Sequence, residues 1–164
     1  FLCGLRSDYT GKISFLNDGT ELNLSSATDY VLLRQRAIAI MFQDLKLFPE
    51  LSSLDNVMLK NQITGFCTEK EVCDMLGKLG LEEYLHTPCA RMSLGQQQRV
   101  AFVRALCQPT DFILLDEPVS HLDNDNAVVM AQMLHERVQR DNVGLIVTSI
   151  GYRLPYEYDR ILQL

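Results

Sequence analysis

The sequence predicts an α/β fold around a parallel sheet, and three observations support that prediction. The run AIAIMF at 37–42 holds six consecutive apolar residues, which is typical of a strand covered on both faces. From residue 92 onward helical and strand patterns alternate, as they do when right-handed crossovers join parallel strands. The chain has 164 residues, of which 47% are hydrophobic, and this is enough to bury one core. We therefore expect a single domain over residues 1–164.

The first half of the chain divides into a β-rich N-terminal portion and a helical middle. The pattern predicts a strand at 11–16 (GKISFL), a hairpin turn through 17–22 (NDGTEL), and a helix at 29–35 ahead of the strand at 37–42. Between residues 49 and 88 apolar residues recur at helical spacing, as at Val72, Leu76 and Leu79. We interpret residues 44–92 as a small helical subdomain within the domain.

The second half of the chain contains the alternating pattern. It predicts helices at 93–107 and 124–140, and strands at 112–115, 143–148 and, at the end, 160–164 (RILQL). The opening FLCGL has the pattern of a helix end without its beginning. We therefore expect this domain to lack its N-terminal part.

Composition argues against several classes of function. The net charge of −6 and the pI near 5.0 argue against a sequence-independent nucleic-acid surface, which needs clustered Lys and Arg. No apolar run approaches the roughly 18 residues that span a bilayer, so we expect no direct membrane span. The five cysteines include no CxxC pair, and we interpret them as small buried apolar residues in a reducing compartment.

Two carboxylates, Asp116 and Glu117, come directly after the apolar residues FILL at 112–115. Ligands bind at the carboxyl ends of parallel strands, so an Asp there is placed to hold Mg²⁺ through its water shell. The next Glu is placed to accept a proton from an attacking water. The alternative is a strand that ends in two solvated acids before a proline turn. The pair alone does not decide between these interpretations.

The stretch RMSLGQQQRV at 91–100 predicts the start of a helix with Ser93 as its N-cap. One interpretation is an ordinary capped helix that packs Val100 and Val103 inward. The other is an anion site, because a helix start that contains Gly95 presents free backbone N–H groups and the positive end of the helix dipole. Capping and phosphate binding use the same groups, so the two interpretations are compatible.

Four short motifs follow one another along most of the chain. They are MFQ at 41–43, MSLGQQQR at 92–99, ILLDEP at 113–118 and SHLD at 120–123. In this order they resemble the Q-loop, signature, Walker B motif and D-loop of the ATP-binding-cassette (ABC) transporter ATPases. The resemblance implies a P-loop NTPase-like parallel sheet core with a small helical subdomain and an N-terminal β-rich portion. The stretch MFQDLKLFPELSSLDNV resembles the branch with the lipoprotein-release, macrolide-export and cell-division cassettes.

In that family two cassettes clamp two ATP molecules head to tail, each nucleotide lying between one chain and the signature helix of the other. The resemblance implies that nucleotide held by a partner chain meets Ser93, Leu94, Gly95 and Gln96, and that Asp123 acts across the dimer interface. ATP and Mg²⁺ are the implied cofactors. The implied assembly is a homodimer or a paired cassette.

The resemblance assigns the hydrolytic roles to four further positions. Gln43 is implied to reach the Mg²⁺ and the attacking water, and Asp116 to hold the Mg²⁺ shell. Glu117 is the implied general base, a role that typically contributes ~10²–10⁴-fold in rate. Ser149 stands where the family has its switch histidine, after the strand VGLIVT.

Three features depart from the family's pattern. The phosphate loop GxxxxGK[ST] is absent, and the Gly11-Lys12 pair precedes a strand instead of opening a helix. Leu94 replaces the usual glycine of the signature, so its side chain must point away from a phosphate. Ser149 replaces the switch histidine, and serine neither reaches as far nor carries charge. Because the phosphate loop supplies most of the N–H groups that hold the phosphates, we expect the chain as it stands to bind ATP poorly, and we expect Ser149 to make hydrolysis slow or dependent on a partner.

The resemblance implies an Mg²⁺-dependent ATPase that energises a membrane permease through nucleotide-driven dimerisation. The implied partners are transmembrane permease subunits and no nucleic acid, and the implied location is cytoplasmic, peripheral on the inner face of the cell membrane. The alternative is a degenerate, non-hydrolysing regulatory or structural cassette, which Ser149 suits. Glu117 favours the enzyme, because a degenerate cassette has little reason to keep the base. The DNA-repair and chromosome-organising relatives are disfavoured, because Ser93 follows Gln43 by only 50 positions without heptads.

Overall fold

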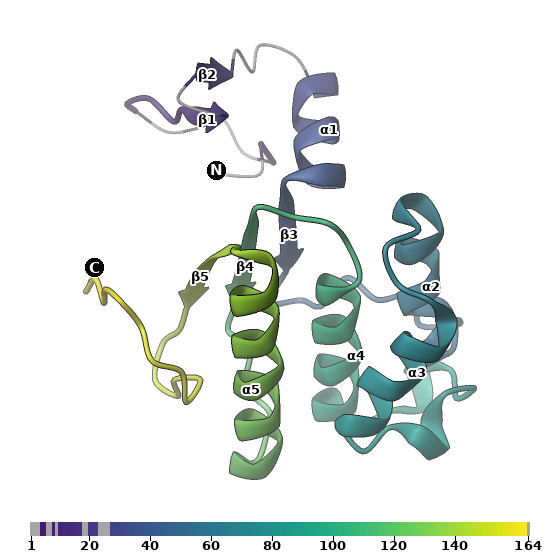
Figure 1. Cartoon of the computed structure of the whole chain (residues 1–164). Coiled ribbons are helices and arrows are strands. Elements are labelled where there is room, and N and C mark those ends of the chain that lie inside the picture. Colours follow the sequence, from purple (N-terminus) through teal and green to yellow (C-terminus); the bar gives the residue numbers. More distant parts are fainter. Residues whose placement is uncertain (1–3, 6–7, 9, 18–19, 23–26, 164) are drawn as a thin grey trace.

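Three parallel strands form the main sheet of the computed structural model, which describes residues 4–5, 8, 10–17, 20–22 and 27–163. They are β3 (Ile38–Met41), β4 (Phe112–Asp116) and β5 (Gly144–Thr148), in the order β3-β4-β5 (Figure 1). Both pairs are parallel, with Phe112 opposite Ile38 on one side and Gly144 on the other. The carboxyl ends of all three strands therefore lie at one edge, and the predicted α/β fold is confirmed.

The chain ahead of β3 follows the predicted order. Strands β1 (Phe15–Asn17) and β2 (Thr20–Leu22) form an antiparallel hairpin, and helix α1 (Ala27–Arg36) leads into β3. The first strand begins at Phe15, the register partner of Leu22, and not at residue 11. In β3 the side chains of Ile38, Ala39 and Met41 are almost completely buried, as the apolar run predicts.

Two α-helices and two 3₁₀ turns occupy the stretch between β3 and α4. They are α2 (Ser53–Thr64), α3 (Glu69–Lys78), η1 (Glu82–Tyr84) and η2 (Cys89–Arg91). Local signals set the helix starts, since Ser52 caps α2 and Thr68 caps α3. Asn56, fully buried on α2, donates to the carbonyl of Phe48 at 3.0 Å and accepts from its N–H at 2.8 Å. This side chain fixes the loop that follows β3.

Helices α4 (Leu94–Leu106) and α5 (Asn124–Asp141) stand beside the sheet, and α2 and α3 pack on α4 (Figure 1). Phe102 of α4, Met130 of α5 and Leu115 of β4 are at most 1% exposed and belong to one continuous core. The chain leaves the last turn of α4 to enter the start of β4 (Figure 1). The first turn of α4 therefore lies toward the carboxyl edge of the sheet.

The expected strand at 160–164 is wrong for the described part of that stretch. Residues 160–163 form no strand, and Ile161 and Leu162 remain 58% and 75% exposed, so burial does not favour pairing there. The expected helix end at FLCGL falls mainly on residues 1–3, which lie outside the described residues. Within the described ranges no helix has the length and apolar character needed to cross a membrane.

Candidate functional site

The carboxyl edge of the sheet gathers residues that follow three different strands. Gln43 comes two positions after β3, Asp116 ends β4, and Ser149 follows β5. Strand β4 lies between the other two, and Asp116 is the register partner of Thr148. The structure thus brings Gln43, Asp116 and Ser149 to the edge where open parallel sheets bind ligands.

Glu117 has a left-handed backbone with φ of 50°, which residues with a side chain adopt rarely. Two hydrogen bonds hold this conformation. The N–H of Glu117 donates to the Thr148 carbonyl at 3.0 Å, and its own carbonyl accepts from the Gln98 side chain at 2.8 Å. Its carboxylate accepts from the N–H of Ile150. The turn therefore presents a half-buried, oriented carboxylate beside the loop that follows β5.

The Asp116 side chain is exposed and anchored on one oxygen only. The Thr148 hydroxyl donates to Oδ1 of Asp116 at 2.6 Å, and Oδ2 takes no part in that bond. Mg²⁺ in phosphate sites takes one or two protein carboxylates and completes its shell with phosphate oxygens and water. A single fixed and solvent-facing carboxylate at the end of a strand fits that ion.

Ser149 joins the edge but its hydroxyl faces its own loop. The hydroxyl donates to the carbonyl of Tyr152. The neighbouring Ile150 N–H is the group that meets the Glu117 carboxylate. The loop after β5 therefore contacts Glu117 through its backbone, and a catalytic role for the Ser149 side chain stays a prediction.

Ser93 caps α4, as predicted, and does so in a capping box. Its hydroxyl accepts from the N–H of Gln96 at 3.2 Å, and Oε1 of Gln96 accepts from the N–H of Ser93 at 2.8 Å. The N–H groups of Leu94 and Gly95 also lie in the first turn, where a helix supplies no acceptor of its own. Leu94 is 47% exposed. The start of α4 can therefore offer backbone donors to an anion.

Gly95 has a packing role that the motif alone does not predict. A Cβ on this residue would lie 2.6 Å from the carbonyl oxygen of His121 and 3.5 Å from Cδ2 of Leu122. The first distance is far shorter than any normal contact, so a side chain here would push the two segments apart. The missing side chain lets α4 touch the loop at 120–123. A phosphate contact of the Gly95 N–H stays a prediction.

Gln98 links α4 to the same loop, a contact that its place in the motif does not predict. Its side chain is 2% exposed, with Nε2 donating to the Glu117 carbonyl at 2.8 Å and to the Ser120 hydroxyl at 3.3 Å. Its Oε1 accepts from the His121 N–H at 3.1 Å. A signal was present, because Gln98 precedes the buried Phe102 by one helical turn and so falls on the apolar face. A buried amide there requires hydrogen-bond partners.

Asp123 is the N-cap of α5, and its carboxylate is already engaged. It accepts from the backbone N–H of Asn126 at 2.9 Å and from the Asn126 side chain at 2.9 Å. These bonds, the backbone bond first, lower the pKa of the Asp123 carboxyl. Asn126 in turn accepts from Arg99 at 3.0 Å, and Arg99 donates to the Leu79 carbonyl at 2.6 Å. Asp123 is therefore linked to α4 and to the end of α3.

The loop after Gln43 is held by the last turn of α4. Leu45 and Lys46 both have left-handed backbones, with φ of 56° and 49°. Arg104 donates to the carbonyl of Leu45 at 2.5 Å and to that of Lys46 at 2.7 Å. Gln43 itself is exposed. Arg104 thus fixes the segment that carries Gln43, a role that the spacing of the motifs does not predict.

Comparison with known proteins identifies the family. A family model described as ABC transporter matches residues 1–120. The chain belongs to the ABC transporter family. This cassette is 29% identical over 166 residues to the lipoprotein-releasing system ATP-binding protein LolD of Ehrlichia chaffeensis, covering 99% of the chain and 71% of LolD. It is 33% identical over 167 residues to the putative hemin import ATP-binding protein HrtA of Staphylococcus epidermidis, covering 99% of the chain and 73% of HrtA.

Solved structures of ATP-binding cassettes share the fold of this cassette. A dimer of the cassette MJ0796 in a post-hydrolysis state, bound to ADP and Pi, superposes with a TM-score of 0.70 at 26% identity. The match covers 82% of this chain but only 62% of that chain. The P-loop NTPase-like fold and the resemblance to the lipoprotein-release branch are confirmed. The chain spans less than two thirds of that solved cassette.

Proposed function

We propose that this cassette is the ATP-binding and ATP-hydrolysing part of an ABC transporter and energises a membrane permease through nucleotide-driven dimerisation. The observation that carries the proposal is the carboxyl edge, where Glu117 stands in its left-handed turn between Asp116 and the loop after β5. LolD and HrtA are both named as ATP-binding proteins, and the MJ0796 cassette was solved as a dimer with ADP and Pi. These relatives support the same conclusion.

The carboxyl edge supplies the chemistry of hydrolysis in this proposal. Glu117, oriented by the Ile150 N–H, accepts the proton of the attacking water as the bond to the γ-phosphate breaks. Asp116 and Gln43 would hold Mg²⁺ and its water shell, and Gln43 would also reach the attacking water. The ion, when bound, neutralises charge that develops on the phosphate oxygens. Ser149 takes part in hydrolysis at the position after β5, where the family has its switch histidine.

The first turn of α4 supplies the contact with nucleotide held by a second cassette. The N–H groups of Leu94 and Gly95 meet the γ-phosphate, while the capping pair Ser93 and Gln96 keeps the turn open toward it. Asp123 acts across the same interface. Either a homodimer or a paired cassette provides the second half of each site.

The stretch between the sheet and α4 has features that fit contact with a permease. We infer that residues 44–92 form the helical subdomain of a single domain spanning 1–164, and that this subdomain meets the permease. Phe48, Leu59 and Ile63 on it are 54%, 40% and 70% exposed, which is apolar surface available to a partner. The location that follows is cytoplasmic and peripheral, on the inner face of the cell membrane.

A second candidate is the non-hydrolysing regulatory cassette. Its supporting observation is Ser149, which replaces a histidine and whose hydroxyl is bonded to Tyr152. A cassette of this kind keeps the fold and the dimer contact without turning ATP over. The oriented carboxylate of Glu117 favours the enzyme, because that geometry has no use in a cassette that only binds.

The test measures ATP turnover with Mg²⁺ in the complete gene product that contains residues 1–164. We expect Glu117→Gln to lower turnover by at least about 100-fold and to accumulate an ATP-bound dimer on size-exclusion chromatography. Glu83→Gln, an exposed change on η1, is the matched control and leaves turnover unchanged. Equal background rates for wild type and Glu117→Gln, with the permease present as well, favour the regulatory cassette.

A further inference from the structure

Cys67 and Cys107 meet although 40 positions separate them in the sequence. Cys67 follows α2, and Cys107 is the C-cap of α4. The Thr64 hydroxyl donates to the Cys107 carbonyl at 3.4 Å, and the two free thiols lie close enough for each to shift the pKa of the other. Two neighbouring thiols on separate elements are candidates for a disulfide.

The backbone of each cysteine is fixed by the fold. The N–H of Cys67 donates to Oδ1 of Asn61 at 2.8 Å, and its carbonyl accepts from Nδ2 of Asn61 at 2.6 Å. Asn61 is only 4% exposed. The N–H of Cys107 donates to the Val103 carbonyl at 3.1 Å, in the last turn of α4. The contact between the thiols therefore belongs to the folded state.

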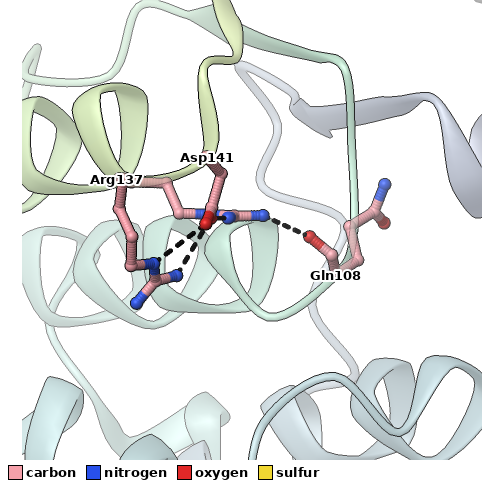
Figure 2. A network of polar contacts seen from close by, with 4 residues as sticks. Gln108, Arg137 and Asp141 are labelled. Carbon is pink, nitrogen blue, oxygen red and sulfur yellow. Dashed lines mark hydrogen bonds and ion pairs between the residues drawn. The ribbon is translucent and has the colours of Figure 1, made fainter.

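Cys67 lines a cavity of about 520 Å³ between α3 and α5, whereas Cys107 is fully buried and does not line it. Arg137 lines the same cavity with its guanidinium 4.5 Å above the Phe66 ring. Figure 2 shows Arg137 held in place by Asp141 and by the carbonyl of Gln108, which accepts from it at 2.9 Å. A small solute can therefore reach Cys67 beside a fixed positive charge.

The surroundings of Cys67 favour its thiolate. The hydrogen bond from Cys107 lowers the pKa of the Cys67 thiol, and Arg137 and Arg140 add to this, against burial and Glu71. The pKa of Cys107 is raised, first because it shares that bond and then because it is buried. The thiol of Cys67 therefore loses its proton more readily than the thiol of Cys107.

Cys73, on α3, provides a matched comparison. It is half-buried like Cys67, but burial and then Glu69 and Asp74 raise the pKa of its thiol. Exposure alone predicts similar reactivity for the two cysteines. The local charges predict that Cys67 reacts and Cys73 does not.

We propose that Cys67 and Cys107 are a peroxide-oxidised dithiol, a modification site that lies outside the nucleotide site and does not depend on the proposed function. The Cys67 thiolate attacks a peroxide oxygen, so an S–O bond forms, the O–O bond breaks and hydroxide leaves. The Cys107 sulfur then attacks the Cys67 sulfur, so the S–S bond forms and the S–O bond breaks. The Cys107 proton leaves with the departing oxygen as water. Two electrons pass to the peroxide, and a dithiol reductant reverses the reaction.

The test treats the folded chain carrying Cys3→Ser with hydrogen peroxide, alkylates the remaining thiols with iodoacetamide in concentrated urea, so that buried thiols react as well, and maps the peptides by mass spectrometry. We expect a linked pair of peptides joined through Cys67 and Cys107, which dithiothreitol separates, and alkylated Cys73 and Cys89. Without peroxide, we expect iodoacetamide to label Cys67 at least about tenfold faster than Cys73. Cys73→Ser is the matched control and forms the same disulfide.

A second variant separates the two chemical steps. Cys107→Ala stops the reaction at the sulfenic acid of Cys67, which dimedone traps, and circular dichroism confirms that this variant is folded. The proposal is overturned if Cys73 oxidises as fast as Cys67, or if the sulfenic acid of Cys67 accumulates while Cys107 is intact. It is overturned as well if the same disulfides form in the same proportions in concentrated urea, because the pairing then owes nothing to the fold.

Discussion

Replacement of Gln98 by leucine tests the link between α4 and the loop that carries Glu117. The Gln98 side chain is 2% exposed and bonds to the Glu117 carbonyl, the Ser120 hydroxyl and the His121 N–H. Leucine has nearly the same volume but has neither donor nor acceptor. The substitution therefore keeps the packing and removes the three hydrogen bonds.

The size of the effect follows from which groups lose their partners. The Glu117 carbonyl keeps a second donor, the Ser120 hydroxyl at 3.3 Å, whereas the His121 N–H loses its acceptor. Each hydrogen bond contributes a net ~0.5–1.5 kcal/mol, and the added apolar burial of leucine offsets part of the loss. We expect the free energy of unfolding to fall by about 2 kcal/mol. If the loop opens locally, the His121 amide exchanges about 30-fold faster.

The assay combines urea unfolding, followed by circular dichroism, with hydrogen exchange of the loop amides measured by NMR. Gln97→Leu is the matched control, because Gln97 donates to the Cys89 and Met92 carbonyls at 3.0 Å each, on the other side of the helix start. We expect Gln97→Leu to lower stability without a specific effect on His121. Equal His121 exchange in Gln98→Leu, Gln97→Leu and wild type would refute the link.

Gln98→Glu separates the donor from the acceptor. A glutamate keeps an acceptor for the His121 N–H, but when ionised it has no donor for the Glu117 carbonyl. Burial raises the pKa of such a carboxyl above its unfolded value near 4.3, so the variant gains a proton on folding. Its stability relative to wild type therefore falls as pH rises from about 5 to about 8. A pH-independent difference would show that the donor to Glu117 is unimportant.

Three further predictions use the same unfolding assay. Gly95→Ala places a Cβ 2.6 Å from the His121 carbonyl oxygen and should lower stability by about 1–3 kcal/mol; an unchanged midpoint would contradict the close packing. Arg104→Met removes both hydrogen bonds that hold the loop after Gln43 and should lower stability by about 2 kcal/mol, with faster exchange in that loop. Burial, and then Arg104, lowers the pKa of Lys60 to about 8. The unfolded chain binds that proton more tightly, so stability should rise by up to about 3 kcal/mol between about pH 8 and pH 10, and Lys60→Met should abolish the rise.

The elements that the sequence predicts well are those set by local signals. The apolar run at 37–42 becomes β3, and Ser93 starts α4 with Gln96 as its capping partner. Periodicity and capping depend on residues within a few positions of each other, so a single sequence contains them. The strand expected at 160–164 is wrong for residues 160–163, because a short apolar pattern does not show whether a sheet edge is free to pair.

The contacts that the sequence does not reveal all depend on which loop lies opposite a helix. In the sequence Gln98 and Arg104 look like ordinary polar helix residues. Their partners lie far along the chain, since Gln98 bonds to Glu117, 19 positions away, and Arg104 bonds to Leu45, 59 positions away. Gly95 fits a phosphate motif, but a glycine is also required at this position because a Cβ would clash with the His121 carbonyl oxygen. The motifs therefore predict where chemistry occurs but not what holds the reacting groups in place.

These contacts make α4 the element that joins the two halves of the proposed site. In the proposed mechanism its first turn offers N–H groups to nucleotide on a partner cassette, while Gln98 holds the Glu117 loop and Arg104 holds the loop of Gln43. A packed helix moves as a unit, so a shift at its first turn has to alter both loops. We therefore expect Gln98→Leu to lower the turnover number for ATP and to leave KM unchanged, because the proposed general base Glu117 loses its support while the proposed nucleotide contacts remain. An increase in KM alone would mean that α4 serves binding and does not connect it to the chemistry.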